Sequence, residues 1–451
     1  MSLNALFSTA RRSLLAHSAA TATTGQNIAN AESPGYSRRA ARLQADPVGR
    51  GGLVITGRPP SGGVGVVEYG RSRLALLDDA ARRGAAARGG AGESARLHAG
   101  LEVELAPDGG GALLGAVADF FDAWGDVANA PTDGGTRDAL LAATETLGHA
   151  FAGAAHRADA YGRSVRAGVA DQVDRVNGLL AEVAQLNEAA RTARAQGADD
   201  LDALDRRDLA LDELSGLAPF AARAEADGTV TVTVAGMVGV QGGEHNALRA
   251  TAPPDDPAVY AEGAGAPLRL DAFEGGAIGA GLGLLTRTIP ETRAALDALA
   301  ADVVGRVNAA HAAGEGLDGV AGRLFFDPAG TTATTLALSA DVTGPGAVAA
   351  AGGGAGPGDA ATATAIGALA EDVGGEAVRL LAGLGARTRT ASAQAAASDA
   401  FAAHADALRD GVTKVSLDEE MADLIRHQQA YAASARVLQT ADSLFDTLLA
   451  I

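Results

Sequence analysis

The C-terminal stretch, residues 416–451, constrains the fold of this chain most strongly. From Leu417 to Leu449 a single stripe of positions recurs at alternating intervals of four and three, most of them apolar. Such a seven-residue repeat is typical of an α-helix that packs one narrow face against a partner helix. Ser416 and Glu419 have the spacing of a capping box, which predicts that the helix begins there. Because an isolated helix gains most of its stability from packing, this stretch requires a partner.

The N-terminal residues 1–30 offer a matching repeat with the same step. Thr and Ala occupy several of its positions, so this helix is weaker by itself. The two chain ends are expected to pair with each other, with other subunits, or with both. Periodicity alone leaves two interpretations open, which are an ordinary bundle core and a seam for assembly. The candidate seam residues are Leu3, Phe7, Leu14 and Ile28 at one end, and Leu417, Met421, Leu424, Tyr431, Leu438 and Phe445 at the other.

A break in the helical pattern follows the N-terminal repeat. Pro34 and Gly35, between Ser33 and Tyr36, are the central residues that a type II turn prefers. Together with Asn27 and Asn30, this segment resembles the N-terminal signature of axial proteins of the bacterial flagellum.

Three further segments resemble the hook-associated protein 1 (FlgK) family in particular. They are the C-terminal stretch and the internal residues 204–217 and 282–314, and they follow one another in the order of the family. The sequence departs from the family at His427, where a larger aromatic residue is usual, and at Ser33, which replaces Thr. Residues 85–165 and 315–400 match only loosely.

This resemblance implies a structural protein at the junction between hook and filament. It implies self-association, contacts with the hook protein and with a second junction protein, and a cytosolic export chaperone on the C-terminal helix. It also implies an extracellular location on the flagellum, reached by type III export of an unfolded chain without a cleaved signal peptide. Alternatives are a hook-type or rod-type axial subunit and a secreted adhesin-like surface protein. The internal segment 204–217 and the C-terminal ending argue against a hook or rod subunit.

Composition limits the other classes of function. The formal net charge is −19 and the chain has a single lysine, Lys414, so phosphate-rich nucleic acids and anionic membranes are unsuitable partners. The absence of cysteine excludes disulfides and thiolate chemistry. Aromatic residues make up only 4% of the chain, so cores built from Ala, Leu and Val are expected, which favours slender helical layers.

The sequence shows no pattern that indicates catalysis. Nucleophile-elbow, phosphate-loop and zinc-protease motifs are absent, and the histidines are scattered. His149 and His156 stand seven residues apart, which is not a metal-ligand spacing. The acidic cluster Asp199, Asp200, Asp202 and Asp205 is attributed to a helix N-terminus, where the macrodipole favours acids. We therefore predict no enzyme and no catalytic, cofactor-binding or metal-ligating residues.

Between the helical stretches, a period of two residues predicts strands. Thr229–Val234 is expected to pair with Phe220–Ala224, and Met237–Val240, Ala247–Ala250 and Leu268–Ala272 are further expected strands. Segments 324–326 and 336–338 are also candidate strands, and Gly89–Gly92 is expected to weaken the helix that carries it.

The expected fold is mainly α, elongated and multi-domain, with a long helical bundle, paired terminal helices and a small inserted β-rich domain. Its expected segments are an axial helix at 1–35, an extended connector at 36–71, helical rod parts at 72–217, 277–313 and 359–414, the β-rich insertion at 218–276, an irregular or β segment of the outer domain at 314–358, and a second axial helix at 415–451.

Overall fold

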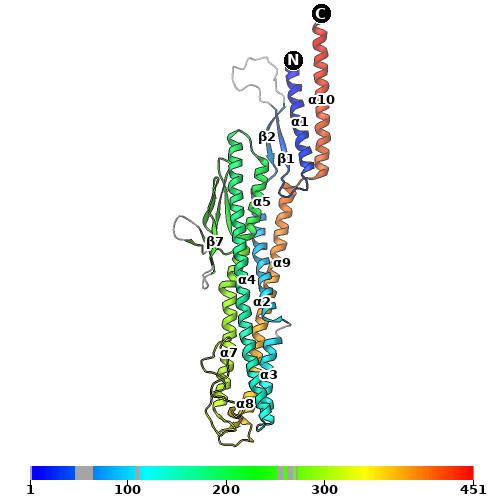
Figure 1. Ribbon diagram of the computed structural model, residues 1–451. Coiled ribbons are helices and arrows are strands. Elements are labelled where there is room, and N and C mark those ends of the chain that lie inside the picture. The colour runs from blue at the N-terminus through cyan, green and yellow to red at the C-terminus, as the bar shows by residue number, and fades with distance from the viewer. Residues whose placement is uncertain are drawn as a thin grey trace.

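The computed structural model describes residues 3–45, 64–107, 111–251, 257–261, 268–270 and 273–449. Its helices form a long rod, and two further helices extend beyond one end of that rod (Figure 1). These two are α1 (Leu3–Ala29) and α10 (Leu417–Leu449), which we call the terminal pair. The prediction of a mainly α, elongated fold with a small β-rich insertion is confirmed.

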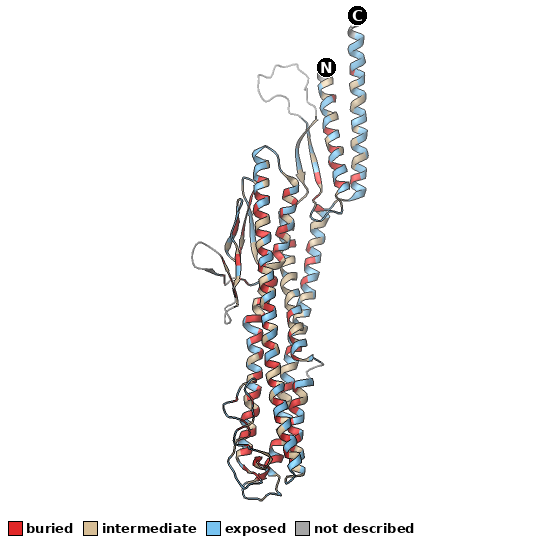
Figure 2. Ribbon diagram, in the orientation of Figure 1, coloured by how far each residue is buried: buried red, intermediate tan, exposed pale blue. Residues whose placement is uncertain are grey.

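The rod is built from long antiparallel helices around a narrow core. Phe120, Trp124 and Phe151 are completely buried in it, so the single tryptophan is a core residue. Buried positions follow the inner faces of the helices while the outer faces are exposed (Figure 2). The rod helices are α2 (Ala75–Leu105), α3 (Gly111–Asn129), α4 (Gly134–Ala195), α5 (Leu201–Leu217), α6 (Gly276–Gly283), the π-helical turn η2 (Leu284–Thr288), α7 (Ile289–Ala312), α8 (Ala361–Gly367) and α9 (Ala370–Thr413).

Helix α2 continues without a break through Gly89–Gly92. A Cβ atom added at Gly89 would lie 2.1 Å from the carbonyl oxygen of Gly216 on α5. The absence of a side chain therefore lets two helices approach closely, and tertiary packing offsets the low helix propensity of glycine.

The β-rich insertion lies against α4. Strand β3 (Phe220–Ala224) pairs with β4 (Val230–Val234) as predicted, and the sheet order is β3-β4-β5-β6. Asn187 of α4 anchors it, since its amide donates to the carbonyls of Val230 and Gly242 and accepts from the Val230 amide. The remaining strands of the insertion are β5 (Met237–Gln241), β6 (Glu244–His245), β7 (Leu248–Thr251), β8 (Ala258–Ala261) and β9 (Leu268–Arg269).

Two strand predictions need correction. The strand expected at Leu268–Ala272 covers only Leu268–Arg269, and residues 271–272 lie outside the described part of the chain. Segments 324–326 and 336–338 share a single bridge, Phe326 to Leu338, instead of forming strands. Phe325 and Phe326 are apolar because both pack into the aromatic core, where Phe325 contacts Trp124 at 5.1 Å between ring centroids.

The far end of the rod, opposite the terminal pair, is an irregular loop region closed by two buried side chains. The guanidinium of Arg137 donates to the carbonyls of Pro131, Pro345 and Val348. His311 of α7 accepts a hydrogen bond from the Ala349 amide. The short elements here are β10 (Gly314–Glu315), η3 (Pro345–Ala347) and β11 (Ala351–Gly352), and β10 pairs with β11.

The terminal pair is antiparallel. Helix α10 begins after Ser416, whose side-chain oxygen accepts from the amide of Glu419 as the capping spacing predicts. The expected connector folds into a hairpin in which β1 (Arg39–Ala45) pairs with β2 (Val64–Arg71) beside α1. No helix in the described ranges is long and apolar enough to cross a membrane.

Candidate functional site: the joint between the terminal pair and the rod

Asn27 lies at the centre of the joint, by which we mean the polar contacts that connect the terminal pair, the β1–β2 hairpin and the rod. Its side chain is 1% exposed. The amide nitrogen donates to the Arg39 carbonyl at 2.8 Å and to Glu420 at 2.9 Å. The amide oxygen accepts from the Arg39 amide and from the Tyr36 hydroxyl, each at 2.9 Å. Every hydrogen-bonding position of this side chain is thus used.

The turn after α1 brings Tyr36 and Arg39 back to Asn27. The amide of Tyr36 donates to the Ser33 carbonyl at 3.2 Å, and Gly35 has φ +77°, as a type II turn requires. A Cβ atom on Gly35 would lie 3.2 Å from the side chain of Leu209 on α5. Only glycine accommodates both the positive φ and this close packing.

Glu420 ties α10 to this turn. Its carboxylate is 2% exposed and accepts from the Arg38 guanidinium at 2.6 Å as well as from Asn27. The hydrogen bond to Glu420 raises the pKa of Arg38 against the opposing effect of burial. The Arg38 backbone continues the connection, because its amide donates to the Thr413 carbonyl at the end of α9, at 2.8 Å. One short segment therefore contacts the terminal pair and the rod.

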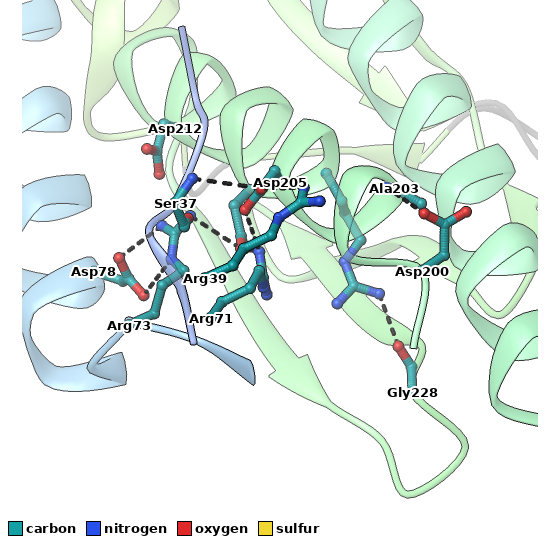
Figure 3. A network of polar contacts seen from close by, with 12 residues as sticks. Ser37, Arg39, Arg71, Arg73, Asp78, Asp200, Ala203, Asp205, Asp212 and Gly228 are labelled. Carbon is teal, nitrogen blue, oxygen red and sulfur yellow. Dashed lines mark hydrogen bonds and ion pairs between the residues drawn. The ribbon is translucent and has the colours of Figure 1, made fainter. Parts of the chain in front are cut away.

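Helix α5 presents a face of carboxylates to the same region. Figure 3 shows Ser37, Arg39 and Arg71 gathered around Asp205, with which both arginines form ion pairs. The next carboxylate along this face, Asp208, is surrounded by more arginines. Its ion pairs are with Arg71 at 2.7 Å, Arg73 at 3.2 Å and Arg82 at 3.2 Å.

The alternating charges continue from the hairpin to α9. Asp212, one turn beyond Asp208, pairs with Arg82 of α2 at 2.9 Å and with Arg409 of α9 at 2.6 Å. Burial raises the pKa of the Asp208 carboxyl, but Arg73, Arg71 and Arg82 outweigh it and hold that pKa below its ordinary value. Because these groups are largely buried, removing one partner leaves an uncompensated charge.

Beyond the joint, α10 has two different faces. The face toward α1 holds Ala441, which is buried, and the half-buried Leu424 and Leu438. The opposite face leaves apolar side chains in solvent, and α10 is mostly exposed in Figure 2. We call this set the exposed stripe. It consists of Leu417, Met421 and Ile425, which recur at intervals of four along the helix. Tyr431, Val437, Leu444 and Phe445 are also exposed, at other angles around α10, and all seven side chains are between 44% and 56% exposed.

The structure therefore divides the candidate seam residues into two groups. Leu424 and Leu438 lie on the face toward α1, and Phe7, Leu14 and Ile28 are half-buried. Leu417, Met421, Tyr431 and Phe445 are instead exposed, the first two of them on the exposed stripe. The side chain of Leu3 lies outside the described part of the structure.

The acidic residues at the start of α5 have two roles, and the sequence predicts only the first of them, which is to favour the helix N-terminus. Asp200 caps α5 by accepting from the Ala203 amide, as acids at a helix start do. Asp202 and Asp205 instead pair with Arg39. The sequence signal for this network, which the prediction did not use, is the spacing of Asp205, Asp208 and Asp212 on one helix face. No group of three or more metal-ligating side chains occurs within the described residues.

Comparison with known proteins places this geometry in a family. The family model for the flagellar hook-associated protein FlgK helical domain matches residues 101–326. A second model, the flagellar basal body rod FlgEFG protein C-terminal, matches residues 412–451, which contain α10. The chain belongs to the FlgK family. The predicted family is thus confirmed.

Individual proteins are similar to the chain over different shares of its length. This FlgK-family chain is 26% identical to flagellar hook-associated protein 1 of Bacillus subtilis (strain 168) over 493 residues, covering 98% of the chain and 97% of that protein. It is 25% identical to flagellar hook-associated protein 1 of Escherichia coli (strain K12), covering 72% of the chain and 60% of that protein. The solved structure of the flagellar hook junction protein FlgK from Burkholderia pseudomallei has 27% identity and a TM-score of 0.49, covering 56% of this chain and 46% of that one.

Family membership supports the main functional prediction. FlgK-family proteins are hook-associated structural proteins that form the hook–filament junction, so the chain is a structural component of the bacterial flagellum.

Proposed function

We propose that this chain joins hook and filament by packing its terminal pair against the terminal pairs of neighbouring subunits. The neighbours are further copies of the chain, the hook protein and a second junction protein. The exposed stripe of α10 is the observation that supports this proposal. Leu417, Met421 and Ile425 follow one another at intervals of four on a single helix face, and each is about half exposed. Such a face is typical of a helix that a partner covers.

The exposed stripe contributes part of the free energy of assembly. Complete burial of a large apolar side chain contributes about 1.5–3 kcal/mol, so covering the exposed half contributes roughly 1 kcal/mol for each residue. The whole stripe therefore supplies several kcal/mol for each subunit, before the cost of association.

The joint has a separate role in this proposal. Asn27, Glu420 and the carboxylates of α5 hold the terminal pair at one angle to the rod. When the terminal pairs of neighbouring subunits pack into an axial layer, the joint therefore fixes the position of each rod and each β-rich insertion outside that layer. The division into axial helices at 1–35 and 415–451, a rod and an inserted domain at 218–276 is part of the proposal.

Before assembly the stripe has to be covered by another protein. We include a cytosolic export chaperone on the C-terminal helix, and export to the cell exterior through the flagellar type III route without a cleaved signal peptide. An apolar face of this length exposed in the cytosol favours aggregation, which gives the chaperone its physical reason. The proposal assigns no catalysis and no cofactor to the chain.

The test replaces apolar residues of the stripe in cells that lack the native protein. The double variant Met421→Gln/Ile425→Gln keeps the helix propensity of α10 and removes apolar area from its exposed face. Leu76→Gln/Val103→Gln is the matched control, because both residues are exposed on α2 of the rod. We expect the stripe variant to fold normally by circular dichroism yet carry few filaments attached to hooks in electron micrographs. The control is expected to carry filaments as wild type does. Normal filament attachment in the stripe variant would refute the proposal.

A further inference from the structure

Two histidines face each other across the terminal pair. His17 of α1 and His427 of α10 have ring centroids 5.7 Å apart and an interplanar angle of 38°. The neighbouring contact along the pair is a hydrogen bond of 2.7 Å between the hydroxyls of Ser13 and Ser434. The packing and assembly described above use neither imidazole.

The His17 ring carries one nitrogen without a hydrogen-bond partner. That atom, Nδ1, is buried. A buried polar atom without a partner costs about 1–3 kcal/mol relative to a satisfied one. A simple apolar contact would be more stable here, so the ring pair points to a ligand that satisfies the nitrogen.

The separation of the rings fits a shared metal ion. An imidazole nitrogen binds Zn²⁺ at about 2.1 Å, and two such ligands on a tetrahedral ion place their ring centroids roughly 5 to 6 Å apart. The observed centroid separation of 5.7 Å lies within that range. Imidazole nitrogen suits Zn²⁺, Ni²⁺ and Cu²⁺, whereas Mg²⁺ and Ca²⁺ prefer oxygen.

We propose that His17 and His427 form a two-imidazole site for a divalent first-row transition metal ion, which fastens α1 to α10. The two rings supply both protein ligands, and solvent completes the coordination. Because the ion binds only when the two helices are side by side, it stabilises the terminal pair by mass action. This function is distinct from the packing of subunits, since it acts within a single chain.

Calorimetric titration of the full-length, EDTA-treated protein with ZnCl2 at pH 7.5 tests the site, and NiCl2 is a second probe. We expect one ion for each chain. His17→Gln and His427→Gln should each weaken binding at least tenfold, because losing even an outer-shell partner of a metal ligand costs 10 to 100-fold. The matched control is His149→Gln/His156→Gln, which removes two exposed histidines of α4 and should leave the affinity unchanged.

A variant in which the terminal pair separates would also lose the ion, so a second measurement uses the wild-type chain. In the wild-type chain, nuclear magnetic resonance of the eight histidine side chains should show that ZnCl2 shifts the imidazole signals of His17 and His427 only. Absence of binding, or affinity retained in the His17→Gln/His427→Gln variant, would overturn the site. Both measurements use the free subunit, so their outcome is independent of filament attachment.

Discussion

The side-chain amide of Asn27 meets the carboxylate of Glu420 at 2.9 Å, although 393 positions separate the two residues in the chain. Both residues are 1% exposed. Burial of a carboxylate is tolerated only where its oxygens accept hydrogen bonds or pair with a cation, and here Asn27 and Arg38 provide these contacts. The first and last helices are therefore connected by a polar contact with defined geometry, in addition to apolar packing.

Removal of the Glu420 carboxylate should loosen the terminal pair. Glu420→Ala removes one of the two acceptors of the Asn27 amide nitrogen and the nearer acceptor of the Arg38 guanidinium, which keeps Asp423 at 3.3 Å, and we expect a loss of about 1–3 kcal/mol. Hydrogen exchange of the α1 and α10 amides measures this loss directly. Glu419→Ala is the control, since that side chain is 68% exposed and lies 4.0 Å from Arg38, and its effect should stay within about 0.5 kcal/mol. Equal exchange in the two variants would show that the buried carboxylate has no special role.

The turn glycine should be similarly sensitive. Gly35→Ala places a side chain at φ +77° and against Leu209, so we expect destabilisation of at least about 1 kcal/mol. Gly25→Ala is a matched substitution inside α1 with no neighbouring atom within 4 Å, and it should stabilise the helix by up to about 1 kcal/mol. Thermal unfolding of the terminal pair, followed by circular dichroism, compares the two. A stabilising effect of Gly35→Ala would contradict the assigned turn.

Sequence analysis predicted the elements better than the contacts between them. The repeat of α10 and the Pro34–Gly35 turn depend on local patterns, and the structure contains both a helix and a turn at these positions. The joint depends on contacts across long separations. Arg71 and Asp208, for example, lie 137 positions apart, and nothing in their local sequence relates one to the other.

The faces of α10 illustrate the same limit. A repeat of four and three places Leu424 and Met421 in one stripe, but a few tens of degrees of helix rotation decide which of them faces α1. Glu420 and Ser434, which hydrogen-bond to Asn27 and Ser13 of α1, lie on the same face as Leu424. Polar contacts thus accompany the inner face, and apolar periodicity alone does not reveal it.

At the other end of the rod, His311 should make stability depend on pH. Burial lowers the pKa of its imidazole, an effect that outweighs the hydrogen bond to the Arg323 carbonyl. The folded chain holds the neutral ring, which accepts from the Ala349 amide, so the unfolded chain binds a proton first as the pH falls. The contribution of His311 is therefore complete above the ordinary value of 6.5 and decreases as the pH falls below it toward the lowered pKa. Hydrogen exchange of α7 at pH 7.5 and at pH 5.5 measures the difference. His311→Gln should reduce the dependence on pH, whereas His149→Gln, at an exposed position of α4, should retain it. An unchanged dependence in His311→Gln would assign the effect to another group.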